Sequence, residues 1–113
     1  MNDVLITEHR QFVADHYHSL PSFCEPRHGH NWEIEVTVKY DCASSRLGSI
    51  LDTWITKVNY SLLNEQEAIA GRNPTAEVLA EWIFQFLTYS DLSPMIVQVR
   101  EKSYYWAACM NCQ

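Results

Sequence analysis

The fold class rests on the stretch Trp-Glu-Ile-Glu-Val-Thr-Val-Lys-Tyr at residues 32–40. Apolar and polar side chains alternate along it, and the side chains of a strand point to opposite faces with a period of two. One face therefore points into a core and the other into water, which is typical of an antiparallel sheet. A weaker strand from about Val4 to Ala14 is expected to pair with it through a loop over residues 19–27.

Two amphipathic helices are expected after these strands. The second has the clearer start, because Asn73 can cap exposed amides while Pro74 takes the first helical position, and it ends within residues 90–94. The first follows a turn-rich segment at residues 41–49 and ends near Asn64. Its apolar positions recur at spacings of three and four: Leu51, Trp54, Ile55, Val58 and Leu62.

Two more strands complete the predicted fold. One spans residues 95–101 and carries Glu101 on the same face as Val97 and Val99, and an aromatic strand follows from Ser103 to about Cys109. The order β-β-α-α-β-β favours an α+β domain, a four-stranded antiparallel sheet with both helices on one face. We expect one domain over residues 1–113, because this length suffices for one core but not for two.

Composition and charge narrow the classes of partner. A net charge of −6 disfavours a general nucleic-acid binder, which would show a basic face. Residues 1–11 contain Asp3, Glu8 and Arg10 and no apolar run, so we expect no secretory signal, no membrane partner and a cytoplasmic location. The four unevenly spaced cysteines are expected to be thiols or ligands and not a disulfide framework.

A metal site is indicated by the histidines. His28 and His30 are separated by one glycine, so in a strand both imidazoles point to one face and can reach one ion. His16 lies twelve residues earlier, and three nitrogen ligands with one open position are what a catalytic zinc centre needs. The alternative is that these are separate surface or core histidines. His9 and His18 are expected to be partly exposed, although His18 could still support a metal ligand.

Cys24 is a candidate for proton transfer beside the metal. A thiol near a Lewis acid and near Arg27 has its thiolate favoured, so it could act as a base on a substrate C–H. The alternatives are an inert buried thiol and a fourth metal ligand, which would indicate a structural metal in an interaction domain. Cys109 and Cys112 form a C-x-x-C without a second metal-binding half and are expected to be inert, and Cys42 has no assigned role.

Five motifs in order carry a resemblance to a known family. They are F-x-A-x-H at residues 12–16, C-x-x-x-H-G-H at 24–30, Gly-Ser-Ile-Leu-Asp at 48–52, Asn-Pro-Thr-Ala-Glu at 73–77, and Glu101. Together they cover most of the chain and resemble the 6-pyruvoyl-tetrahydropterin synthase and 6-carboxy-tetrahydropterin synthase family. The resemblance implies a tunnelling fold, in which three subunits close their sheets into a barrel and two trimers stack into a homohexamer.

The resemblance also implies roles for individual residues. It implies Zn2+ at His16, His28 and His30, and it places the catalytic cysteine at Cys24. Glu101 aligns with the family's pterin anchor, and a carboxylate can accept two parallel hydrogen bonds from the 2-amino and N3–H edge of a pterin. Thr75 matches a position near the substrate, although an ordinary helix-start threonine is the alternative, and Glu77 is expected to interact with the helix dipole.

One departure from the family separates two functions. The family carries an Asp-His pair where this chain has Asn59 and Tyr60, and neither residue replaces that couple in proton transfer near neutral pH. We therefore expect a zinc-dependent pterin lyase with altered activity, acting on dihydroneopterin triphosphate or a related pterin. The alternative is a zinc-containing pterin-binding or assembly protein without full synthase activity.

Overall fold

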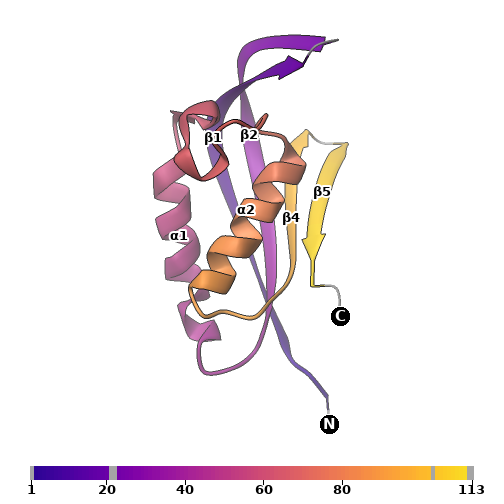
Figure 1. Cartoon of the computed structure of the whole chain (residues 1–113). Coiled ribbons are helices and arrows are strands. Elements are labelled where there is room, and N and C mark those ends of the chain that lie inside the picture. Colours follow the sequence, from indigo (N-terminus) through magenta and orange to yellow (C-terminus); the bar gives the residue numbers. More distant parts are fainter. Residues whose placement is uncertain (1, 21–22, 103, 112–113) are drawn as a thin grey trace.

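The structure, a computed structural model, describes residues 2–20, 23–102 and 104–111 (Figure 1). Its strands and α-helices are β1 (Leu5–Leu20), β2 (Phe23–Lys39), α1 (Leu47–Val58), β3 (Ser61–Leu62), α2 (Ala76–Tyr89), β4 (Pro94–Lys102) and β5 (Tyr105–Met110). Single 3-10 turns lie at Ser44–Arg46, Leu63–Glu65 and Glu67–Ile69.

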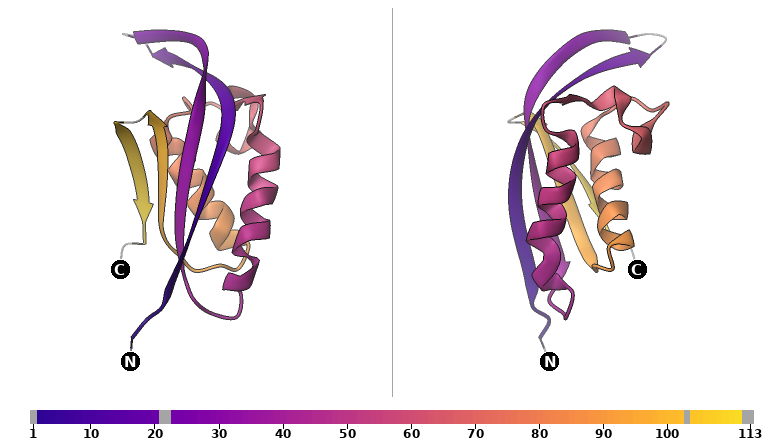
Figure 2. Two further views of the ribbon diagram at one scale, coloured as in Figure 1. Left: turned by 180° about the vertical axis from the view of Figure 1, so that it is seen from behind. Right: turned by 90° about the vertical axis from the view of Figure 1, so that its left-hand side faces the viewer.

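The sheet has five strands in the order β3-β1-β2-β4-β5. Both helices cover one face of it, as the edge-on view in Figure 2 shows, so the predicted α+β class and one-sided helix layer are confirmed. The prediction of four antiparallel strands in the order β-β-α-α-β-β is wrong. The fifth strand, β3, lies between the helices in sequence and pairs parallel to β1 at Ala14 and Asp15. Two residues are too short to leave a periodic pattern in the sequence.

The hairpin of β1 and β2 is longer than predicted. Residues 19 and 24–27, which were expected in a loop, belong to the strands, while residues 21–22 lie outside the described part of the chain. A register shift lies between His16 and His18. Figure 2 shows the ends of both strands bending over the helix side of the sheet. The apolar alternation fades here because these side chains face the end of the core and no longer its centre.

Both helices begin or end at residues other than those predicted. Helix α1 ends at Val58 and not near Asn64, because the next residue is extended and Tyr60 has a positive φ of 59°. Thr75 and not Asn73 caps α2, its hydroxyl accepting from the Val78 amide at 3.2 Å. The predicted end of α2 is confirmed, since the helix stops at Tyr89.

The core fills the space between the helices and the inner face of the sheet. Phe12 stacks on Trp32 across β1 and β2, with ring centroids 5.9 Å apart, and meets the edge of Trp54 from α1 at 5.3 Å. The inner face of β1 continues from Phe12 and Ala14 to His16, all three buried. A buried histidine therefore stands where the apolar stripe ends. Among the described residues, no helix is long and apolar enough to cross a membrane.

Candidate metal and substrate site

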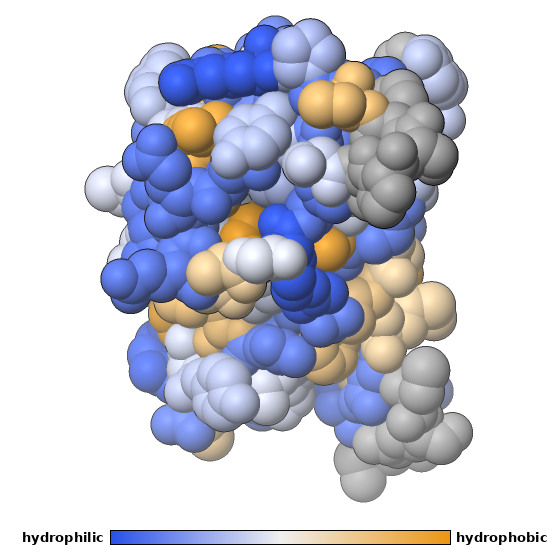
Figure 3. Space-filling view, turned by 45° about the horizontal axis from the view of Figure 1, so that its top comes forward, coloured by the Kyte–Doolittle hydropathy of each residue, from blue (hydrophilic) through white to orange (hydrophobic). Residues whose placement is uncertain are grey.

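Three histidines meet at the end of the sheet beside the start of α2. His16 lies directly across from His28 in the register of β1 and β2, and His30 follows two residues later on the same face. One ring nitrogen of each lies within 4.8 Å of the others. The structure thus brings together the three residues predicted as metal ligands. This end of the molecule, where the hairpin projects, has a mostly hydrophilic surface (Figure 3).

Backbone carbonyls fix the orientation of two of these rings. Nδ1 of His16 donates to the Pro74 carbonyl at 2.7 Å, and Nδ1 of His28 donates to the Pro26 carbonyl at 2.7 Å. Each neutral ring therefore carries its proton on Nδ1 and its lone pair on Nε2. The two Nε2 atoms face one another at 3.1 Å. Two lone pairs at that distance repel, unless a proton or a cation lies between them or beside them.

Glu101 supplies the negative charge at this cluster. From the inner face of β4 its Oε1 lies 3.0 Å from Nε2 of His16 and 3.6 Å from Nε2 of His30. Burial of His16 disfavours its charged form, but the Glu101 carboxylate and the Pro74 carbonyl outweigh this, and the pKa of His16 is raised above 6.5. The hydrogen bond between His16 and the Glu101 carboxylate lowers the pKa of Glu101, although burial alone would raise it. Without a metal, Glu101 therefore favours the protonated form of His16.

His30 has a different electrostatic setting. Burial lowers its pKa, the Glu101 carboxylate opposes this, and repulsion from His16, His28 and Lys102 adds to the lowering. Its Nε2 is buried and has no hydrogen-bond partner among the described residues. A neutral imidazole with an unpartnered buried nitrogen aimed at two other histidines is suited to bind a cation.

The donor set fits a zinc ion. Nitrogen ligands 2.0–2.1 Å from a tetrahedral zinc lie about 3.3–3.4 Å from one another, close to the 3.1 Å between His16 and His28. The carbonyls that hold the Nδ1 protons of these two rings are the kind of outer partner that orients ligating histidines. Three neutral imidazoles also leave room for a fourth ligand.

The space beside Gly29, the residue between His28 and His30, is small. A Cβ at Gly29 would lie 2.7 Å from Oδ1 of Asp15, its partner across the hairpin. Arg27 holds that carboxylate from the other side, with Nε to Oδ2 at 2.8 Å. A larger residue at this position would therefore require the Asp15 carboxylate, which is paired with Arg27, to shift.

Cys24 is not brought to the histidines within one chain. It is exposed on β2, opposite Ser19, and belongs to neither group of closely spaced ligand atoms among the described residues. Its neighbour Glu25 is the group that sequence reasoning missed, since Oε1 of Glu25 lies 2.8 Å from Nε2 of His28. The sequence held no periodic signal for it, because residues three apart in a regular strand point to opposite faces.

Thr75 and Glu77 lie at the start of α2, close to the cluster. Thr75 uses its hydroxyl as the helix cap. Glu77 accepts a hydrogen bond from the Tyr105 hydroxyl of β5. Burial raises the pKa of Glu77, but the bonds from Tyr105, its own backbone and Thr75 outweigh this and the pKa is lowered, while the bond to Glu77 raises that of Tyr105. Glu77 thus makes a side-chain contact in addition to its expected place at the helix dipole.

The remaining two histidines differ. His9 lies on the exposed side of β1 with its Nε2 3.4 Å from Glu33, as expected for a histidine outside the site. His18 is half-buried, its ring packs edge-on against His16 at 4.8 Å, and its Nε2 is buried without a hydrogen-bond partner among the described residues. His18 follows His16 by two residues on β1, so the strand period of two places both rings on one face, and it was missed because the predicted strand ended at Ala14.

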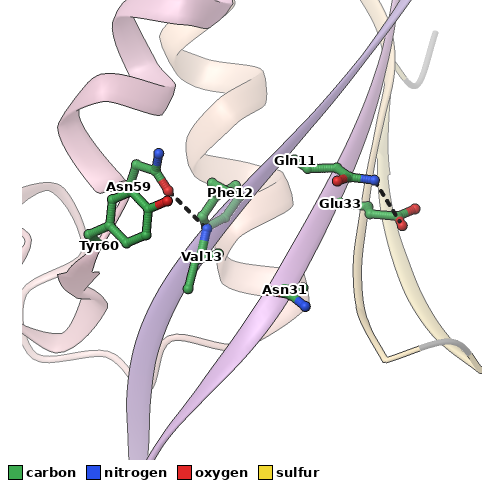
Figure 4. A pocket seen from close by; sticks show the side chains of 7 residues that line it. All are labelled: Gln11, Phe12, Val13, Asn31, Glu33, Asn59 and Tyr60. Atoms are coloured by element: carbon green, nitrogen blue, oxygen red, sulfur yellow. Dashed lines mark hydrogen bonds between the residues drawn. The ribbon is translucent and has the colours of Figure 1, made fainter.

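Asn59 and Tyr60 lie beside β1, three residues before His16. Oδ1 of Asn59 accepts from the Val13 amide at 2.9 Å, and the Tyr60 amide donates to the Val13 carbonyl at 2.6 Å. Both line a pocket of about 360 Å³ with residues from β1 and β2 (Figure 4). The Tyr60 side chain is 82 % exposed. Within one chain these two residues therefore fix the end of α1 and do not contact the histidines.

The fold and the site define an α+β domain with a three-histidine centre at one end of its sheet. The chain belongs to the 6-pyruvoyl tetrahydropterin synthase family, whose sequence model matches residues 5–111, and the resemblance seen in the motifs is confirmed. A protein of Archaeoglobus fulgidus, provisionally named as a 6-carboxy-5,6,7,8-tetrahydropterin synthase, is 31% identical over 99 residues, which are 80% of this chain and 83% of that protein.

Solved structures share the fold. The 6-pyruvoyl tetrahydropterin synthase of Caenorhabditis elegans superposes with a TM-score of 0.82 at 17% identity, over 99% of this chain and 98% of that one. The 6-pyruvoyl tetrahydropterin synthase of Plasmodium vivax gives a TM-score of 0.78 at 12% identity, over 98% and 99% of the two chains. These likenesses establish the architecture of the domain.

Proposed function

We propose that this chain is a zinc-dependent lyase of the tetrahydropterin synthase kind, acting on dihydroneopterin triphosphate or a related pterin. The observation that carries the metal part is the facing pair of Nε2 atoms of His16 and His28, each ring held by a backbone carbonyl. Membership of the family supports the reaction class.

In this proposal His16, His28 and His30 hold the zinc, which when bound polarises the oxygens of the substrate side chain. Glu101 holds the pterin ring, because an ionised carboxylate can accept two parallel hydrogen bonds. Once Nε2 of His16 is committed to a metal, it has no proton to donate to Glu101. The carboxylate is then released for the pterin edge, so metal binding prepares the substrate site.

Proton transfer is assigned to Cys24, with Glu25 as the second candidate. Cys24 matches the family motif and is exposed, whereas the Glu25 carboxylate already contacts the ring of His28 at 2.8 Å. Thr75 would contact the substrate from the start of α2. Of the proton-transfer candidates, Glu25 is favoured by distance within one chain, and Cys24 is favoured by the motif.

We further propose that the chain is a single domain that works as a homohexamer of two stacked trimers. The support is the shape of the sheet: β3 covers only Ala14 and Asp15 of β1, and β5 forms the opposite edge. Large apolar side chains are exposed near these edges, among them Trp106 and Met110 on β5 and Tyr60 beyond α1. Pairing of such edges between subunits would cover them.

Turnover tests the reaction. Purified zinc-loaded protein is incubated with dihydroneopterin triphosphate, and the products are followed by chromatography. Product formation that is lost in Cys24→Ala, with zinc content unchanged, supports the lyase with Cys24 as base, and loss in Glu25→Gln instead assigns that role to Glu25. Tight pterin binding without turnover would support the pterin-binding or assembly protein. Zinc loss in Cys24→Ala would make Cys24 a ligand, contradict its assignment as the base and favour a structural metal.

A further inference from the structure

A second set of ligand atoms overlaps the three-histidine set. His16, His18 and Glu101 each offer one ligand atom, and these three atoms lie within 4.8 Å of one another. The buried, unpartnered Nε2 of His18 belongs to this region, and its ring lies 4.8 Å from that of His16. A buried ring nitrogen without a partner is costly, so its position in the cluster calls for a ligand.

The two sets cannot hold two ions through His16. Its Nδ1 donates to the Pro74 carbonyl, which leaves only Nε2 for a metal. We propose that His16, His18 and Glu101 form an alternative binding position for the same divalent cation, which moves between this set and the set with His28 and His30. Each chain then holds one ion with two available environments.

The alternative set has its own chemistry. Two imidazoles and one carboxylate give it a formal charge of −1, whereas the three-histidine set is neutral. Two histidines with one carboxylate are a donor set typical of Fe2+ sites, so this position should accept Fe2+ and Co2+ as well as zinc. This inference rests on the metal of the proposed function but not on its reaction. If Glu101 also binds the pterin, the two ligands compete for it, and pterin binding shifts the ion toward His28 and His30.

Cobalt binding to single and double variants tests the inference. Co2+ is titrated into metal-free protein, and the affinity and the visible absorption of the bound ion are measured. We expect His28→Ala to bind Co2+ more weakly than the natural chain but measurably, since the alternative set is intact. Adding His18→Ala to it should weaken binding by at least the 10- to 100-fold that the loss of an outer partner of a metal ligand costs. His18→Ala alone should change the affinity little.

His9→Ala in the His28→Ala background is the matched control, because His9 lies on the same strand, outside the cluster, and half exposed. The inference is overturned if the His18 and His9 double variants bind Co2+ equally, or if His28→Ala binds none. If the natural chain itself binds no metal, the proposed zinc function fails together with this inference. If the natural chain binds Co2+ but the two double variants bind it equally, only this inference fails. The same comparison in a His30→Ala background gives the answer should His28→Ala fail to fold, as judged by circular dichroism.

Discussion

Glu101→Gln is the change that separates the two possible uses of this carboxylate. Oε1 of Glu101 lies 3.0 Å from Nε2 of His16, and only 13% of the side chain is exposed, so the glutamine stays in the same place. The substitution keeps the size of the side chain, removes its charge and turns one acceptor into an NH2 donor. That donor would face the donor edge of a pterin.

The expected loss of pterin affinity follows from the hydrogen bonds involved. A hydrogen bond to a charged group contributes about 1.5–3 kcal/mol. Since about 1.4 kcal/mol corresponds to a factor of ten, the variant should bind a pterin about 10- to 150-fold more weakly. The three histidines remain, so zinc content at pH 8 should be unchanged. In the metal-free chain the pKa of His16 should fall, because burial still disfavours its charged form and the carboxylate that opposed burial is gone.

Calorimetry with a soluble pterin measures the affinity, metal analysis gives the zinc content, and an NMR titration follows His16. Glu35→Gln is the control, because Glu35 lies between the buried Ile34 and Val36 and therefore points to the opposite face of the sheet. Unchanged pterin affinity in Glu101→Gln would refute the anchor. Global unfolding of the variant would show that the pair of Glu101 and His16 is structural.

Three further predictions concern the metal and the missing acid–base pair. His28→Ala should lose most of its zinc on purification while His9→Ala keeps about one per chain, as metal analysis would show, and full retention in His28→Ala would contradict the site. Because the pKa of His16 is raised above 6.5, its stabilising contribution to the metal-free chain is complete below pH 6.5 and is lost as the pH rises through its folded-state pKa. The zinc affinity should rise over the same pH range, because the metal must displace the proton on His16, by up to about tenfold per pH unit for one proton released. A zinc affinity that stays constant from pH 6 to 8 in a competition assay would show that metal binding does not displace this proton. The double variant Asn59→Asp with Tyr60→His should turn over the pterin faster, since positioned acid–base groups contribute about 10²- to 10⁴-fold to a reaction rate. Rapid turnover by the natural chain, with no gain in the double variant, would contradict the alignment of these residues with the family's Asp-His pair.

The part of the site that follows from strand periodicity was predictable. A period of two places His28 and His30 on one face, whereas His16 was named from the three ligands that a zinc centre needs and from the family motif, because the predicted strand ended at Ala14. The position of His18 beside His16 follows from the same period of two, but the predicted strand ended at Ala14. The contact between Glu25 and His28 was not predictable, because it depends on the register shift in the hairpin, which leaves no periodic signal.

The fold was predictable where long patterns exist. The alternation in β2 and the apolar stripes of the helices gave the class and the layers. The strand β3 was missed because two residues leave no periodic pattern, and the start of α2 was missed because two neighbouring polar residues could each cap it. Asn73 and Thr75 are both good caps, and only the tertiary contact of the Asn73 side chain with the Ser19 amide leaves Thr75 to cap α2.

The hydrogen bond from His16 to the Pro74 carbonyl joins the ligand cluster to the segment that leads into α2. Pro74 is buried, and Thr75 and the first turn of the helix follow it directly. A ligand that binds only the folded state raises the free energy of unfolding in proportion to the logarithm of its concentration. A cation bound at His16 in the proposed site would therefore also stabilise the docking of α2, although none of the proposed metal ligands lies on that helix. Loss of the ion and release of the start of α2 would then be coupled.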